Sequence, residues 1–206
     1  HTNCLPISDA ACKKIMPVSW NLYQYSFVCN KTMDLARQLD LKPINKDIDV
    51  LFVCNPHPEH DLLYAHRKHG QSIVTESKRL AKYNIRTKYY KKRSEYRNAV
   101  ARSKICVCPY GLGGRIALDQ LSLLSGSIAV KPPMDHMIAA PDIYSEDCFE
   151  YVKLDWSDLE DKLIEILENW DCYEKNALRR RARVKKYDEQ YYANKYADAV
   201  LDVIGY

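Results

Sequence analysis

The sequence predicts an α/β domain in which a parallel sheet of about five strands carries helices on both faces. Three observations predict it: short apolar runs alternate with stretches of helical periodicity, the connections between them are short, and the run DVLFVCN is continuously apolar. Such alternation implies right-handed crossovers between parallel strands. We therefore expect a Rossmann-like domain with C-terminal helices over residues 47–206. Residues 1–46 are expected to be an N-terminal extension or the remnant of a preceding lobe.

The first half of the chain supplies the first two strands and their helices. Within residues 1–46, the aromatic stretch SWNLYQYSFV precedes a helix, TMDLARQLDL. DVLFVCN is typical of a central parallel strand. Residues 58–83 have apolar positions at helical spacing, and IRTKYY is the next strand. SEYRNAVARS is a helix that Ser94 caps, with Tyr96, Ala99 and Val100 facing inward.

The second half repeats the pattern. KICVCPYG is a strand, RIALDQLSLLSG is a helix that ends at Gly126, and SIAVKP is a strand that ends at a proline. CFEYVKL is the last strand, and WSDLEDKLIEILENW is an amphipathic helix with a serine cap. The remainder is predicted to be a helix, a break near Tyr187 and Asp188, and a final helix.

The composition is that of a folded, water-soluble protein. Of 206 residues, 47% are hydrophobic and 28% charged, which excludes a disordered chain. No apolar run approaches the roughly 20 residues of a membrane span, and the N-terminus lacks a signal core. The eight cysteines are scattered, which favours reduced thiols and a cytoplasmic compartment. Because the chain begins with His1, we expect a segment of a longer polypeptide with neighbouring domains.

Three of the six glycines, Gly111, Gly113 and Gly114, follow the strand KICVCP within four positions. In an open parallel sheet, ligands bind beyond the carboxyl ends of the strands. Glycines let the backbone approach an anion, and the following helix adds free N–H groups, a positive dipole end and Arg115. The pattern predicts a phosphate site, or else a tight turn without a ligand. It matches neither the dinucleotide fingerprint nor the P-loop.

The order strand, C-P-x-G-x-G, helix, L-x-x-G-x-I-x-V-K-P resembles the C-terminal, donor-binding half of GT-B glycosyltransferases, especially the exostosin-like and group 1 types. The resemblance covers residues 47 to about 185, and only 104–132 are specific. It implies a glycosyltransferase that moves a sugar from a UDP- or GDP-linked donor to a glycan or glycoprotein hydroxyl. A weaker likeness to glycosyltransferases of large DNA viruses suggests rhamnose or fucose.

The donor contacts that we predict come from the resemblance and from the loops at the sheet's carboxyl edge. They are Asn55, Arg67, Tyr90, Lys92, Tyr110, Gly111, Leu112, Gly113, Gly114, Arg115, Asp119 and Lys131. Many family members contact the ribose through a glutamate where this chain has Leu121. Asp119 is the nearest carboxylate, but two residues is about 200° around a helix, so it is no simple substitute. Residues 1–46 are also too short for the family's acceptor lobe.

Catalysis needs a base for the acceptor hydroxyl and charge stabilisation for the leaving diphosphate. His57, His60 and Asp135 are the candidate bases, and the glycine-loop amides with Arg115 and Arg67 would stabilise the diphosphate. We predict no metal and no cofactor besides the donor. Asp47 and Asp49 could share a cation, but they stand before a strand rather than after it. The cysteine and histidines of CNPHPEHDLLYAHRKH match no closed zinc pattern.

Two other functional classes stay open. Between Lys78 and Arg93 there are eight lysines and arginines and no acidic residue, with tyrosines interleaved. This stretch is predicted to place Tyr89 or Tyr90 near a nucleotide base, and its alternatives are a solvated face or a nucleic-acid stripe. RRRARVKK is a cationic helix terminus or a contact for acidic partners or lipids. A non-catalytic nucleotide- or glycan-binding module is the alternative to an enzyme.

Overall fold

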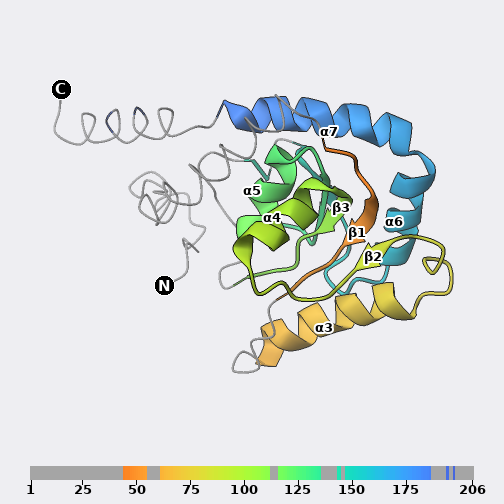
Figure 1. Cartoon of the computed structure of the whole chain (residues 1–206). Helices are drawn as coiled ribbons and strands as arrows, with labels where there is room; N and C mark the ends of the chain where they lie inside the picture. Colours follow the sequence, from red (N-terminus) through yellow and green to blue (C-terminus); the bar gives the residue numbers. More distant parts are fainter. Residues whose placement is uncertain are drawn as a thin grey trace.

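The computed structural model describes residues 44–54, 61–111, 116–135, 143–144, 147–186, 194 and 197. It confirms the α/β class, because one sheet of five parallel strands has the order β2-β1-β3-β4-β5 (Figure 1). The strands are β1 (Ile48–Leu51), β2 (Ile85–Arg86), β3 (Ser103–Val107), β4 (Ile128–Lys131) and β5 (Phe149–Tyr151). The helices are α3 (Asp61–Glu76), α4 (Arg93–Ala101), α5 (Ala117–Leu124), α6 (Leu159–Glu168) and α7 (Trp170–Lys185).

Helices cover both faces of the sheet, as the sequence predicts. Cys106 of β3 and Cys108, just beyond the end of the strand, pack in the apolar cluster that contains α4 and α5. Ile105 and Val107 pack in the other cluster, which contains Val74 of α3 and the apolar side of α6. Because successive strand side chains point to opposite faces, this alternation places the central strand between two apolar layers. All four side chains are fully buried.

The element boundaries confirm some sequence signals and correct others. Gly126, which follows the C-cap residue Ser125 of α5, has a φ of 67°, as expected for the residue that ends a helix. The predicted serine caps are wrong: Lys92 precedes α4, which places Ser94 inside the helix, and Asp158 precedes α6. The predicted break near Tyr187 lies outside the described residues. So do the elements expected in residues 1–43.

The strand β2 is shorter than expected, with two residues where the run IRTKYY suggested six. Beyond Arg86 the chain leaves the sheet, and the side-chain amide of Gln71 on α3 donates to the Thr87 carbonyl at 3.4 Å. Tyr89 and Tyr90 therefore belong to the connection into α4. An edge strand has only one neighbour to hold it, and short edge strands are common for that reason.

Charged side chains at the amino edge of the sheet pair with one another. Asp47 binds Arg102, with 2.7 Å between Oδ1 and Nε, and Asp49 binds Lys104 at 2.7 Å. The two carboxylates thus serve ion pairs at the end opposite the expected crevice. Nearby, the Lys46 ammonium donates to the Ser125 carbonyl at 2.9 Å, and burial lowers its pKa to about 8. This contact satisfies a carbonyl that the end of α5 leaves open.

The arginine run of α7 holds the helix onto the sheet. Arg180 is buried, and its guanidinium binds Glu150 of β5 at 2.8 Å. Arg181 donates to the Leu124 carbonyl at the end of α5, at 2.9 Å. Two residues of the predicted cationic terminus are therefore structural, while Arg179 and Arg183 are exposed.

The composition predicts reduced thiols and no membrane span. Cys54, Cys106, Cys108 and Cys172 form no disulfide, and burial raises the pKa of Cys106 to about 12. Within the described ranges, none of the helices combines the length and the apolar composition that crossing a bilayer requires.

Replacing Gly70 by Ala is expected to destabilise the fold. A Cβ at this position would lie 2.9 Å from the Trp156 ring and 3.0 Å from the Phe52 ring, and both rings are fully buried. Overpacking of this kind costs about 1–3 kcal/mol. The helix preference of Ala returns about 0.8–1 kcal/mol. Urea denaturation should show a net loss of unfolding free energy.

The matched control is Thr75→Ala, an exposed position on the same helix. Surface changes of that kind usually stay within about 0.5 kcal/mol. Equal stability of the Gly70 variant and the control would contradict the close packing of α3 on Trp156.

Candidate functional site

The strand order creates a topological switch point between β1 and β3. From β1 the chain runs outward to β2, and it then returns to place β3 on the other side of β1. Helix α3, which follows β1, packs on one face, while α5, which follows β3, packs on the other. In open parallel sheets the carboxyl ends of two such strands border the crevice in which ligands bind. We name this place the β1–β3 crevice.

Helix α3 connects the segments that leave the strands at this edge. The Gln71 side-chain amide donates to the Phe52 carbonyl, directly after β1, at 2.8 Å. The Arg67 guanidinium donates twice to the Tyr110 carbonyl, after β3, at 2.9 and 2.8 Å. The Trp156 indole, after β5, donates to the His66 carbonyl at 3.0 Å. One helix thus fixes the exits of three strands relative to one another.

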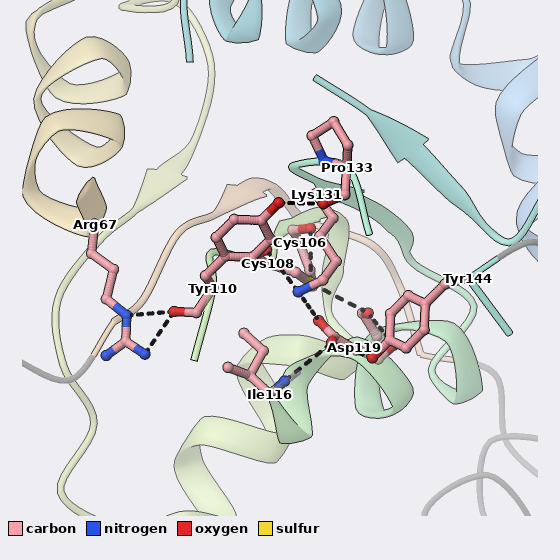
Figure 2. A network of polar contacts seen from close by, with 10 residues as sticks. Arg67, Cys106, Cys108, Tyr110, Ile116, Asp119, Lys131, Pro133 and Tyr144 are labelled. Atoms are coloured by element: carbon pink, nitrogen blue, oxygen red, sulfur yellow. Dashed lines mark hydrogen bonds and ion pairs between the residues drawn. The ribbon is translucent and has the colours of Figure 1, made fainter. Parts of the chain in front are cut away.

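Tyr110, the residue just before the glycine stretch, is held at three points, and Figure 2 shows two of them, the contacts with Arg67 and Pro133. Its carbonyl accepts from Arg67, its hydroxyl donates to the Pro133 carbonyl, and its ring stacks on His66 with centroids 5.4 Å apart. Burial, followed by the charge of Asp135, raises the pKa of the Tyr110 phenol. Tyr110 therefore links the exits of β3 and β4 to helix α3.

A buried ion pair supports the start of α5. The Lys131 ammonium lies 3.1 Å from the Asp119 carboxylate, and both side chains are fully buried. The same carboxylate accepts the Tyr144 hydroxyl at 2.7 Å and the backbone N–H of Ile116 at 3.1 Å (Figure 2). Asp119 occupies the third position of α5, where a carboxylate can satisfy an open N–H group. The pair thus connects β4 to the helix that begins at the crevice.

His66 lies in an aromatic stack surrounded by positive charge. Its ring stacks on Tyr110 and on Trp156, with the Trp156 centroid 4.8 Å away. Trp156 is itself buried and has a φ of 63°, a backbone conformation that a bulky residue holds only when its contacts require it. Burial, followed by the charges of Arg67, His69 and Lys131, lowers the pKa of His66 to about 4. The neutral ring therefore occupies an electropositive region.

Acidification is expected to destabilise the fold through His66. Its pKa is about 4 in the folded chain, below the ordinary 6.5, so the unfolded chain binds more protons between these values. Stability is then highest above about pH 6.5 and falls as the pH approaches 4. Urea denaturation at pH 7 and pH 4.5 should show a smaller loss for His66→Phe than for the native chain.

The control for this comparison is Thr75→Ala, at an exposed position of the same helix that carries no titratable group. It should keep the native pH dependence. An unchanged pH dependence in His66→Phe would show that the stacked imidazole does not titrate as its surroundings require.

The structure brings some of the predicted site residues together at the crevice. Arg67, Tyr110 and Gly111 lie there, and Asp135 is exposed after β4 with its charge close enough to affect Tyr110. Seven predicted residues lie outside the described part of the chain. They are Asn55, His57, His60, Leu112, Gly113, Gly114 and Arg115.

Four other predicted donor contacts have surroundings that the sequence did not reveal. Asp119 and Lys131 bind each other without reaching solvent, so their contact with a ligand stays a prediction. Tyr90 lines a cavity beside α4, and Lys92 pairs with Glu95 at 3.7 Å. Their contact with a base or a phosphate likewise stays a prediction.

Several contributors to the site carry no sequence signal of their own. The sequence predicts only helix or loop positions for His66, Gln71, Trp156 and Tyr144, because their roles come from contacts between distant segments. A hint was present for His66, since YAHRKHG follows the first strand. Among the described residues, no three histidine, cysteine or acidic side chains are grouped closely enough to hold a metal ion.

Comparison with known proteins adds no relative. A scan against models of protein families found no match for this chain, and a search of the curated proteins found no matching sequence.

Proposed function

We propose that this chain is a glycosyltransferase domain that binds the diphosphate of a nucleotide sugar in the β1–β3 crevice. The observation that carries the proposal is the anchoring of Tyr110. Arg67 and His66, both from the helix after β1, hold the residue that leads into the glycine stretch after β3. In open α/β sheets, nucleotides bind at such a switch point. The fixed position of Tyr110 also lowers the entropy cost of ligand binding.

Electrostatics favour an anion at this place. The charges that act on His66 are all positive, and the N-terminus of α5 adds the positive end of its dipole. An unpaired carboxylate in the first turn of α5 would repel a diphosphate. The ammonium of Lys131 compensates the charge of Asp119 there. The buried pair therefore leaves the start of the helix available to a negative ligand.

The proposed reaction moves a sugar to an acceptor hydroxyl on a glycan or glycoprotein. The bond between the anomeric carbon and the diphosphate oxygen breaks, and a bond to the acceptor oxygen forms. The acceptor proton passes to a base. Asp135, which is exposed after β4, is one candidate, and His57 and His60 are the others. Arg67 and the N–H groups at the start of α5 stabilise the departing diphosphate. The donor is UDP- or GDP-linked, with rhamnose or fucose as the first sugars to try.

The test is a donor screen by isothermal titration with UDP, GDP, dTDP and their sugars, followed by an assay for nucleotide release. We expect one base to be preferred, and turnover with a matching sugar donor and glycan acceptor. Binding without turnover would instead indicate a donor-binding module. Absence of binding by every nucleotide, in a chain that unfolds cooperatively, would contradict the proposal.

A further inference from the structure

A cavity lies between α4 and the edge strand β2. It has a volume of about 510 Å³, within the 300–1,000 Å³ of typical small-molecule pockets. Its wall includes Ile48 of β1, Arg86 of β2, Tyr90, and Ser94 and Asn98 of α4. We name it the edge groove. The groove runs from Ile48, at the start of β1, to Arg86, which ends β2 in register with Leu51.

Several hydrogen-bonding groups in the edge groove are not engaged. Within the described ranges, the side chains of Arg86, Ser94 and Asn98 form no hydrogen bond or ion pair. Arg102, which also lines the groove, is bound to Asp47. Polar side chains that converge on a cavity without partners are the groups that orient a ligand.

The mixture of groups favours a polyhydroxylated ligand. Arginine only donates and the carboxylate of Glu95, another lining residue, only accepts, while Ser94 and Asn98 do both. Sugar hydroxyls can donate and accept, so they match such a lining. A phosphate chain only accepts, so it has no donor for Glu95. The half-buried ring of Tyr90 offers an apolar surface with a polar edge, which suits the face of a sugar ring.

The charge around the groove favours an acidic ligand. Lys88, Lys91 and Arg93 are exposed in the connection from β2 and at the start of α4. The Glu95 carboxylate is 3.7 Å from the Lys92 ammonium, so one acidic group is already partly compensated. The guanidinium of Arg86 can bind a carboxylate or sulfate through two parallel hydrogen bonds.

We propose that the edge groove binds an acidic saccharide, with its ring on Tyr90 and its carboxylate or sulfate on Arg86. None of the lining residues takes part in the contacts that anchor Tyr110, and the site does not depend on the proposed transferase activity. A chain that acts on glycans would gain a second anchoring point for a long acceptor.

The test is titration of the full chain with a hyaluronan tetrasaccharide, followed by calorimetry and by amide NMR shifts. We expect saturable binding with shifts at Ser94 and Asn98, and at least tenfold weaker binding in Arg86→Ala and in Tyr90→Ala. The matched control is Arg93→Ala, which removes the same charge from the start of α4 but does not line the groove. It should change the affinity by less than threefold.

Three outcomes would overturn the inference. One is no saturable binding of the tetrasaccharide. Another is equal weakening by Arg86→Ala and Arg93→Ala, which would indicate attraction by charge alone. The third is tighter binding of a single-stranded RNA oligonucleotide, with the same dependence on Arg86. UDP and GDP titrations of Arg86→Ala separate this inference from the proposed function, because that variant leaves the crevice intact.

Discussion

Replacing Lys131 by Met is expected to lower the free energy of unfolding by about 3–5 kcal/mol, the usual effect of removing one partner of a buried ion pair. Both side chains are fully buried, with the ammonium 3.1 Å from the carboxylate. Without Lys131, the Asp119 carboxylate keeps hydrogen bonds from Tyr144 and Ile116 but loses its counter-charge. Urea denaturation at pH 7 measures the loss.

Two companion variants make this result specific. Asp119→Asn combined with Lys131→Met removes both charges and keeps an acceptor for Tyr144, so it should regain most of the stability. Lys162→Met removes a half-exposed ammonium that lies 2.8 Å from Glu165, and such surface pairs contribute at most about 1 kcal/mol. A Lys131 variant no less stable than the Lys162 variant would contradict the role of the buried pair.

Replacing Arg67 by Ala is expected to weaken nucleoside diphosphate binding by about 10–100-fold. The guanidinium anchors the Tyr110 carbonyl through two hydrogen bonds and contributes positive charge beside His66. Hydrogen bonds of a charged group contribute about 1.5–3 kcal/mol, and each 1.4 kcal/mol corresponds to a tenfold change in affinity. Calorimetry with the nucleotide that binds best measures the change.

Arg67→Lys and Arg179→Ala are the matched variants for this measurement. Lysine keeps the charge but not the fork of two donors, so its affinity should lie between those of the native chain and the alanine variant. Arg179 is exposed on α7, and its removal should leave the affinity unchanged. Equal affinity of the native and Arg67→Ala chains would remove Arg67 from the site.

The sequence was sufficient for the architecture, because its signals are local. Continuous apolar runs predicted the central strands, and Gly126 ended α5 at the expected residue with a left-handed backbone. Caps were predicted less well. Serine is a good cap in general, but the chain enters α4 at Lys92 and α6 at Asp158. The choice among neighbouring positions depends on tertiary contacts, which no local pattern records.

The candidate site was only partly accessible from the sequence. The glycine stretch and Arg67 could be placed near the crevice, since both follow central strands. The pairing of Asp119 with Lys131 could not, because it depends on how α5 packs against β4. A polar residue beside a predicted site reads equally well as a ligand contact or as a buried partner, and burial decides between the two.

The central claim is that the crevice between β1 and β3 accepts a diphosphate. The most direct measurement is a titration of the ¹⁵N-labelled chain with inorganic pyrophosphate, followed by amide and arginine side-chain NMR. We predict saturable shifts at the amides of Gly111 and Ile116 and at Nε of Arg67. Shifts restricted to the exposed arginines of α7, or no saturable shifts at all, would contradict the claim.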